Sequence, residues 1–151
     1  MNDVKLDQID GERYADKCIS IQDDEVLADK VHEELLREFV LARDLCHKNI
    51  THYKYFVRRY DPKTRISTFH IITELVQGET LARHLNGCRD GIIADIEKLQ
   101  DISVQIVDAM RYIHKLGKMH SNLKLENIQI ENLYGRIKLI DLAVPPELKK
   151  N

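Results

Sequence analysis

A long amphipathic stretch near the start of the chain does most to limit its fold. Between residues 25 and 45, apolar residues recur at steps close to three or four, and charged residues fill most of the remaining positions. The apolar members are Leu27, Val31, Leu35, Leu36, Phe39 and Leu45. This spacing forms one apolar stripe along a helix, so it predicts a long helix that packs on a core.

Strand-like segments flank this predicted helix. "ERYADKCISI" (residues 12–21) alternates like a strand after Gly11, which predicts a first strand pair before Asp23. Farther along, "HYKYFVRRY" and "ISTFHIITEL" are rich in aromatic and β-branched residues, and the "DPKT" between them (residues 61–64) favours a turn because proline fixes φ. We therefore expect a β-hairpin after the helix.

A second periodic stretch covers residues 96–116. Its apolar residues are Leu99, Ile102, Ile106, Met110 and Ile113. Gly117 follows where a helix end often needs a left-handed φ, so a second long helix is predicted to end there.

Before this second helix, "ETLARHL" indicates a short helix and "NGCRDG" a loop. After it, "NIQIENLYGRIKLIDL" predicts two short strands around Tyr134 and Gly135, and the prolines of "VPPELKKN" prevent a further strand.

Size and charge exclude several classes of protein. A chain of 151 residues suits one globular unit. Its net charge of -2 gives no field that would attract nucleic acid or an anionic membrane, so we expect neither as a partner. No apolar run approaches the ~20 residues that span a bilayer, and the polar start "MNDVKLDQID" is unlike a signal peptide. We expect an intracellular, cytoplasmic location.

The cysteines and histidines show no metal-ligand spacing. Cys18, Cys46 and Cys88 are odd in number and far apart, which favours reduced thiols over disulfides or a C-x-x-C site. The seven histidines are scattered, and His114 and His120 straddle a predicted helix end. We therefore expect neither zinc nor haem.

Two motifs near the end of the chain resemble those of the protein kinase family. The kinase catalytic-loop pattern H-R-D-L-x-x-x-N maps onto "HSNLKLEN", from His120 to Asn127, and differs only at Ser121 and Asn122. "IKLIDLA" then stands where kinases have a strand followed by D-F-G, with Asp141 as its aspartate. The resemblance runs from about residue 4 to residue 143.

The resemblance also assigns residues in the first half of the chain. "YADKCI" is similar to the kinase strand that ends V-A-I-K, with Lys17 as the lysine that contacts phosphate. On the following helix, Glu38 is the first candidate for the glutamate that pairs with Lys17, and Glu34 is the second.

"HIITELVQGETL" is similar to the kinase fifth strand and hinge. Thr73 then takes the gatekeeper position. The hinge, Glu74 to Val76, would face adenine.

The resemblance implies an α+β, protein-kinase-like fold: an N-lobe antiparallel sheet with one long helix, then the first part of a mainly helical C-lobe, truncated at both ends. Residues 1–76 would form the partial N-lobe from about its second strand to the hinge, and residues 77–151 the partial C-lobe as far as D-L-A. No G-x-G-x-x-G loop is present, and only sixteen residues precede Lys17, too few for the complete pair of strands that carries that loop in kinases. The helix at 96–116 would expose apolar surface that further helices normally cover, which predicts a partner or marginal stability.

Substitutions within the motifs bear on the chemistry. Asn122 replaces the catalytic aspartate and cannot act as a base, because a carboxamide has no anionic form near neutral pH. Ser121 replaces the arginine that holds a phosphorylated activation loop in many kinases, and Ala143 replaces the glycine of D-F-G.

Other positions keep the expected residue types. Lys124 corresponds to the lysine near the γ-phosphate, while Asn127 and Asp141 correspond to the magnesium ligands. ATP and Mg²⁺ therefore remain open as cofactors. The alternative is that these residues have no role in nucleotide binding, with Lys124 simply solvated and Asp141 a turn residue.

These substitutions predict a truncated pseudokinase that regulates or scaffolds a protein partner, such as an adjoining kinase domain, without phosphoryl transfer. Two alternatives stay open: a weakly active ATP-dependent serine/threonine kinase, and a non-functional fragment of a longer kinase. "NITHY" and "ELVQGETLARHL" most resemble the pseudokinase domain of the amino-acid-starvation-sensing kinase that acts on translation initiation factor two.

Overall fold

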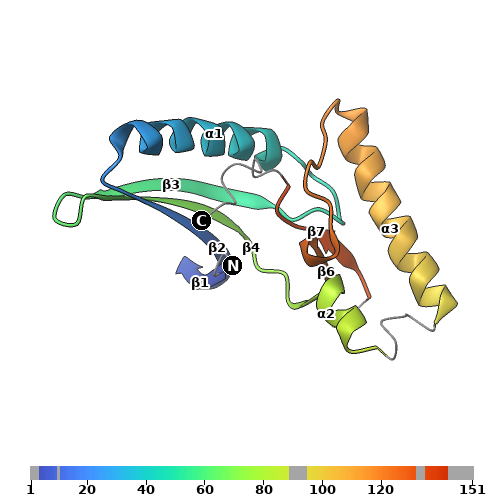
Figure 1. The fold of residues 1–151 in the computed structure, drawn as a ribbon. Helices are drawn as coiled ribbons and strands as arrows, with labels where there is room; N and C mark the ends of the chain where they lie inside the picture. The colour runs from blue at the N-terminus through green and yellow to red at the C-terminus, as the bar shows by residue number, and fades with distance from the viewer. Residues whose placement is uncertain (1–3, 10, 89–94, 132–134, 143–151) are drawn as a thin grey trace. The chain divides into compact units, whose positions relative to one another are not determined.

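The computed structural model describes residues 4–9, 11–88, 95–131 and 135–142, which form two compact units. The first unit contains β1 (Val4–Ile9), β2 (Glu12–Gln22), α1 (Glu25–Arg43), β3 (Tyr53–Asp61) and β4 (Ile66–Glu74) (Figure 1). The second contains residues 45–51 and the elements β5 (Gly78–Thr80), α2 (Leu81–Asn86), α3 (Ile96–Lys115), the 3₁₀ turn η2 (Leu125–Asn127), β6 (Ile128–Glu131) and β7 (Ile137–Leu139). None of the helices described is long and apolar enough to cross a membrane.

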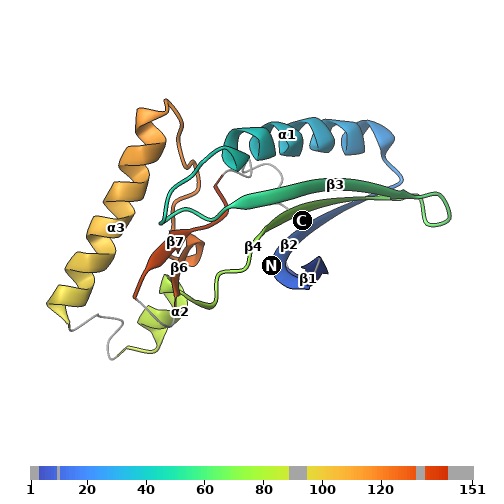
Figure 2. The ribbon, with the colours of Figure 1, turned by 180° about the vertical axis from the view of Figure 1, so that it is seen from behind.

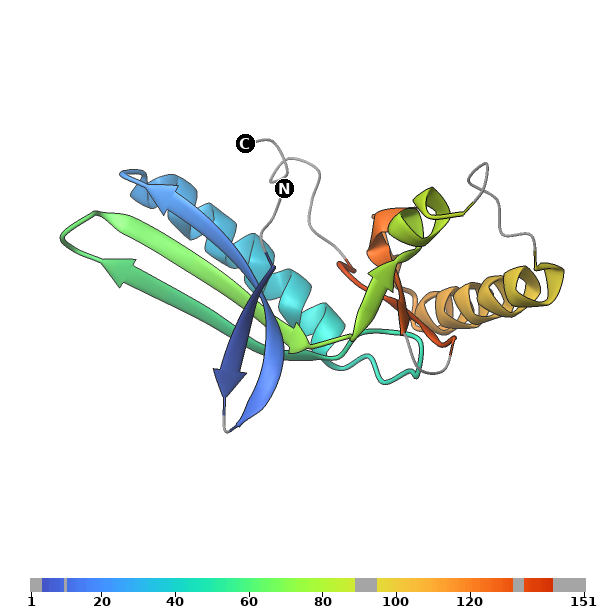
Figure 3. The ribbon, with the colours of Figure 1, turned by 90° about the horizontal axis from the view of Figure 1, so that it is seen from below.

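The first unit is an antiparallel sheet in the order β1-β2-β4-β3, with α1 lying along one face (Figure 3). Its register pairs Lys17 with Ile71, and Ile71 with Phe56. Directly paired side chains point to the same face of a sheet. Because Phe56 contacts Phe39 of α1, this is the face that the helix covers.

Apolar packing holds α1 on that face. The helix buries Val31, Leu35 and Phe39 at steps of four, and the sheet contributes Phe69, which is fully buried. At the start of α1, the Asp24 side chain accepts a hydrogen bond from the backbone N–H of Leu27 at 2.8 Å, a helix cap of the expected kind. Packing and capping therefore both support the predicted helix.

The turn between β3 and β4 is held by polar contacts. The Asp61 carboxylate accepts hydrogen bonds from the backbone N–H of Lys63 at 2.9 Å and from the hydroxyl of Thr64 at 2.8 Å. The Lys63 N–H, followed by the Thr64 hydroxyl, holds the pKa of Asp61 below its usual value, because both stabilise the ionised form. The "DPKT" turn thus forms through the chemistry that its residues predict.

In the second unit, α3 packs beside a small antiparallel sheet in the order β5-β6-β7 (Figure 2). Ile102, Ala109 and Ile113 are the buried residues of the helix, and Ile137 and Leu139 of β7 are fully buried. A Cβ on Gly78 would lie 1.8 Å from the carbonyl oxygen of Ile130, so only glycine allows β5 to approach β6 this closely.

The segment at residues 45–51 adds to this unit through an isolated parallel bridge between Ile50 and Leu139 of β7. The backbone N–H of Thr51 donates to the Leu139 carbonyl at 2.9 Å, and the N–H of Leu139 donates to the Asn49 carbonyl at 2.8 Å. The fully buried Asn49 side chain also donates to the carbonyl of Ile137 at 2.8 Å and to Oε1 of Gln105 at 2.7 Å. One amide therefore links this segment to β7 and α3.

The kinase-like fold predicted from the sequence is confirmed, with differences of detail. The first long helix ends at Arg43, and β5 forms where no strand was predicted. Gly117 has the left-handed φ of 67° that was expected at the end of the second helix. Leu99, assigned to the inner face of that helix, is 46% exposed, and Val104 and Val107 are also exposed. The expectation that this helix presents apolar surface is therefore confirmed for the residues described.

Candidate functional site

The loop from His120 to Asn127 links the end of α3 to β6 in the second unit. His120 is 1% exposed, and the carbonyl of His120 accepts a hydrogen bond from the Asn122 backbone N–H at 2.6 Å. Ser121 between them has a φ of 53°, a left-handed value that is uncommon for a residue with a side chain. The tight turn anchors the loop at His120 and leaves the Asn122 side chain half-buried.

Three predicted site residues meet through side-chain hydrogen bonds. The Asn122 amide donates from Nδ2 to Oδ2 of Asp141 at 2.9 Å. The Asn127 amide donates from Nδ2 to the backbone carbonyl of Asn122 at 2.8 Å and lies 3.5 Å from the same Asp141 oxygen. Asp141 has a φ of 59°, so its backbone adopts a conformation that favours glycine or asparagine. The residue in place of the catalytic aspartate is therefore a donor to the predicted metal ligand.

Backbone hydrogen bonds hold Asn127 in place at this site. The Asn127 N–H donates to the Lys124 carbonyl at 2.9 Å, and the Asn127 carbonyl accepts from the N–H of Ile140 at 2.9 Å. Asn127 is buried, whereas Lys124 is exposed. The loop thus positions Asn127 within the fold and leaves the Lys124 side chain facing solvent.

The residue types at this site fit magnesium. Mg²⁺ binds carboxylate and carbonyl oxygens and keeps several waters, so few protein ligands are needed. Asp141 supplies a carboxylate, and Asn127 supplies an amide oxygen once its Nδ2 is committed to the Asn122 carbonyl. Within the described residues there is no group of three or more His, Cys, Asp and Glu side chains that could hold a metal ion. A magnesium ion here would therefore depend on phosphate and water for most of its ligands.

The lysine and glutamate predicted for nucleotide binding lie in the first unit. Lys17 is half-buried on β2, on the sheet face that α1 covers. Glu38 of α1 is 6% exposed and belongs to the buried side of the helix, whereas Glu34 is half-buried. The burial of Glu38 favours it over Glu34 as the glutamate of this pair.

The hinge residues divide between the two units. Thr73 pairs in register with Ala15, two positions from Lys17 on the same sheet face. Glu74 accepts a hydrogen bond from the backbone N–H of His52 at 2.8 Å within the first unit. Val76 is buried in the second unit, where its carbonyl accepts from the Gln129 side chain at 2.9 Å. Of the D-L-A motif, Ala143 lies outside the described residues.

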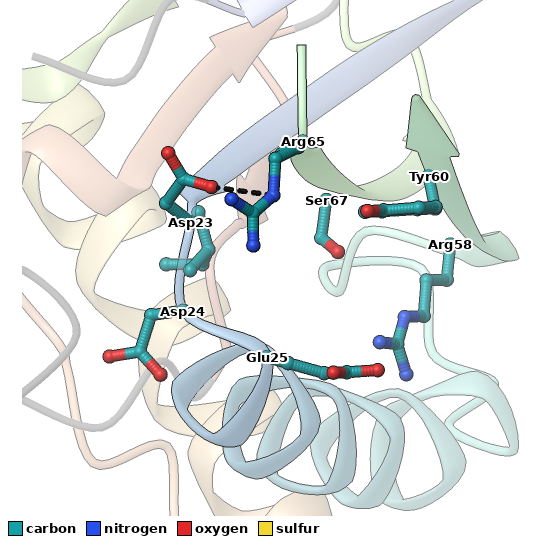
Figure 4. Close-up of a pocket in the computed structure, with 8 residues that line it drawn as sticks. Asp23, Asp24, Glu25, Arg58, Tyr60, Arg65 and Ser67 are labelled. Carbon is teal, nitrogen blue, oxygen red and sulfur yellow. Dashed lines mark ion pairs between the residues drawn. The ribbon is translucent and has the colours of Figure 1, made fainter. Parts of the chain in front are cut away.

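A pocket in the first unit lies at the start of α1 and contains none of the predicted site residues (Figure 4). Its volume is about 470 Å³. Two arginines reach it, but Arg65 pairs with Asp23 at 2.9 Å, and Arg58 pairs with Asp29 at 2.8 Å. Both cations therefore already have carboxylate partners.

Comparison with known proteins decides the family. The family model described as "Protein kinase domain" matches residues 5–151. The chain belongs to the protein kinase domain family. Members of this family generally use ATP and magnesium, which agrees with the residue types at Asn127 and Asp141.

Individual relatives are kinases of greater length. The chain is 28% identical over 146 residues to "MAP kinase kinase kinase SSK2" of Saccharomyces cerevisiae, covering 97% of this chain and 8% of that protein. It is 28% identical over 144 residues to "Mitogen-activated protein kinase kinase kinase 1" of Arabidopsis thaliana, covering 94% and 22%. It is 27% identical over 141 residues to "Probable serine/threonine-protein kinase WNK9" of Oryza sativa subsp. japonica, covering 92% and 32%. The chain therefore spans less than a third of each of these relatives.

Sequence reasoning did not find a polar cluster on the other face of the first unit's sheet. There Asp16 and Cys18 of β2 each lie within hydrogen-bonding range of His70 on β4. The alternation of β2 places Asp16 and Cys18 on the face opposite Lys17, which was a usable signal. Their histidine partner lies more than fifty positions away along the chain, so only the strand register identifies it.

Proposed function

We propose that this domain is a pseudokinase that keeps the kinase frame and does not transfer phosphate. The observation that carries the proposal is the Asn122 amide, which donates to the Asp141 carboxylate at 2.9 Å. In a kinase, the aspartate at this position accepts the proton of the substrate hydroxyl. Asn122 cannot accept it, and the loss of a general base costs typically ~10²–10⁴ in rate.

The amide also changes the electrostatics around Asp141. An aspartate at position 122 would bring a second carboxylate close to Asp141, and two like charges at that range need a cation between them. An amide donor satisfies the Asp141 oxygen without a metal ion. We infer that the loop is stable in the absence of Mg²⁺, which suits a domain that works without turnover.

Nucleotide binding without turnover is compatible with this site. Bound Mg²⁺ would neutralise charge on the phosphates, with Asn127 and Asp141 as its protein ligands. Lys124 of the same loop is the cation that would approach the phosphates. Melting curves with ATP and Mg²⁺ test this role, because a ligand at a hundredfold excess over its Kd stabilises the folded state by ~2.7 kcal/mol. No shift at millimolar ligand would exclude useful occupancy.

A protein partner is the second part of the proposal. Val104 and Val107 of α3 are 66% and 64% exposed, which provides an apolar surface on the helix. We propose that the domain regulates or scaffolds such a partner, of which an adjoining kinase domain is the type we favour. Val104→Asp and Val107→Asp should abolish the effect on the partner and leave the melting temperature of the isolated chain unchanged.

A radiolabelled phosphate-transfer assay tests the absence of catalysis. The chain is incubated with labelled ATP, Mg²⁺ and a general protein substrate, beside an Asp141→Ala variant that lacks the predicted metal ligand. We expect no difference between the two, at the level of background. Transfer by the wild-type chain that disappears in Asp141→Ala would overturn the proposal.

A weakly active serine/threonine kinase is the second candidate, and the names of the relatives favour it. In that case positioning and metal ions would supply most of the rate without a base at position 122. Asn122→Asp separates the two candidates. A modest gain over an already active wild type favours the enzyme, whereas a gain from zero favours the pseudokinase.

The closer resemblance to the pseudokinase domain of the translation-initiation-factor-two kinase stays a prediction. It rests on the segments "NITHY" and "ELVQGETLARHL". The third possibility, a fragment without a function of its own, predicts that neither ATP nor any partner changes the stability of the chain.

A further inference from the structure

Three polar side chains form a connected row on the sheet face opposite α1. Cys18 of β2 and His70 of β4 are direct cross-strand partners, and Cys18 Sγ lies 3.9 Å from His70 Nε2. Asp16 lies two positions before Cys18 on the same face, and its Oδ2 is 2.9 Å from His70 Nδ1. A cysteine, a histidine and an aspartate therefore stand in the order that activates a nucleophile in many enzymes.

The burial of Asp16 fixes the direction of these contacts. Asp16 is 5% exposed, and its Oδ2 accepts a hydrogen bond from the Nδ1–H of His70. With the ring hydrogen on Nδ1, the Nε2 of His70 has a lone pair, which faces the Cys18 thiol and the Thr68 hydroxyl, 3.3 Å away. The imidazole can therefore take a proton from the thiol.

The Asp16 carboxylate is only half satisfied by hydrogen bonds. Oδ1 of Asp16 is buried and has no hydrogen-bond partner among the described residues. A buried carboxylate that is only half satisfied is costly, and an adjacent imidazolium would offset that cost. If His70 takes the thiol proton, the resulting imidazolium lies beside this carboxylate, with its Nδ1 at 2.9 Å from Oδ2.

We propose that Cys18 is a nucleophilic thiol and that this face of the sheet is a site of covalent modification by small disulfides. His70 Nε2 takes the thiol proton, and the Cys18 sulfur attacks one sulfur of the disulfide. The disulfide bond of the reagent breaks as a mixed disulfide with Cys18 forms. The other half of the reagent leaves as a thiolate and receives the proton from His70. One disulfide is exchanged for another, so no further oxidant is needed.

The other two cysteines of the chain provide matched controls. Cys46 is exposed, and Cys88 is half-buried like Cys18. The Cys88 thiol donates to the backbone carbonyl of His84 at 3.3 Å, a partner that cannot take the proton. Exposure alone therefore predicts that Cys46 reacts first, whereas the proposal predicts Cys18.

The test is the rate of modification of each cysteine by 2,2′-dithiodipyridine in the folded full chain, measured by peptide mass mapping. We expect Cys18 to react roughly tenfold or more faster than Cys46 and Cys88, as activation by a base requires. The ratio of the Cys18 rate to the Cys46 rate tests the proposal in the wild-type chain, so no substitution is needed. A Cys18 rate equal to or below that of Cys46 would overturn it.

Two variants separate base catalysis from exposure. His70→Gln keeps a donor toward Asp16 but has no basic nitrogen, so it should remove the rate advantage of Cys18 and leave Cys46 unchanged. Thr68→Val removes the hydroxyl that shares Nε2 and should retain the advantage. If Cys18 still reacts faster than Cys46 in a folded His70→Gln chain, the histidine is not the base. If Thr68→Val abolishes the faster reaction of Cys18, the rate advantage depends on sheet packing and not on His70.

Discussion

The predicted nucleotide residues of the first unit lie on regular elements, whereas those at the catalytic loop of the second unit are joined by side-chain amides. Lys17 lies on β2 and Glu38 on α1, so the packing of α1 on the sheet positions both. Asn122 and Asp141 lie outside the helices and strands and are held by a hydrogen bond at 2.9 Å.

Because of this difference, we expect substitutions to affect the two sets of residues in different ways. Apolar packing is cooperative, so damage to the first unit's core affects every residue on it. A polar loop can change its charge through one side chain while the surrounding backbone contacts remain. Position 122 can therefore carry an amide in place of a carboxylate while the surrounding loop keeps its backbone structure.

The largest expected effect is on the core of the first unit. Phe69→Ala removes a fully buried ring that Arg58 covers at 5.6 Å, and large-to-small core changes of this kind cost about 3–5 kcal/mol. Urea unfolding measures the loss. Tyr60→Ala, at a residue 59% exposed on the same hairpin, should change stability by less than about 0.5 kcal/mol. Equal losses of unfolding free energy in Phe69→Ala and Tyr60→Ala would show that burial of the Phe69 ring does not determine the stability of this unit.

A smaller effect is expected from the buried amide of the second unit. Asn49→Leu leaves the Ile137 carbonyl without its side-chain donor and should cost about 1–3 kcal/mol in unfolding free energy. Asn86→Leu, at an exposed position of α2, serves as the control. A neutral Asn49→Leu would mean that apolar packing, and not hydrogen bonding, holds this unit together.

Asn122→Asp should lower stability by on the order of 1 kcal/mol in a metal chelator, because two carboxylates then face one another. Millimolar Mg²⁺ should restore the melting temperature of this variant more than that of the wild type. Asn86→Asp adds the same charge at an exposed site and should show no such dependence. A variant that is equally stable with and without Mg²⁺ would contradict the proposed environment of Asp141.

The smallest effect concerns the exposed turn of the first unit. The Lys63 N–H and the Thr64 hydroxyl depress the pKa of Asp61, so their contribution to stability is present above the unfolded-state pKa and is lost as the pH falls through the folded-state pKa. Thr64→Ala should move the pKa of Asp61 back up toward its usual value. An NMR titration of the Asp61 carboxyl group checks this, and a pKa that does not rise would assign the depression to the backbone N–H groups of Lys63 and Thr64.

Local patterns predicted much of the fold because they depend on neighbours in the chain. The stripe that includes Val31, Leu35 and Phe39, and the turn at "DPKT", each follow from residues within a few positions. The same reasoning could not separate Leu35, which is fully buried, from Leu36, which is 39% exposed. Adjacent residues on a helix both fit an approximate stripe, and only the position of the sheet separates them.

The site was predicted as a set of residues but not as a set of contacts. Motif order identified Asn122, Asn127 and Asp141, yet the bond between Asn122 and Asp141 joins residues nineteen positions apart and depends on the left-handed backbone at Asp141. The pairing of Asp16 with His70 spans 54 positions and depends on strand register. Long-range geometry of this kind is set by tertiary packing, which local periodicity does not encode.

The most direct test of the central claim is phosphoryl transfer measured side by side in the wild-type chain and Asn122→Asp, with ATP and Mg²⁺ at saturating concentration. Intact-mass measurement of the chain and of an added protein substrate would count every phosphate transferred. We expect no transfer by the wild type over many hours, with any activity confined to Asn122→Asp. Phosphate transferred by the wild type, whatever the rate of Asn122→Asp, would contradict the claim that the amide at position 122 removes catalysis.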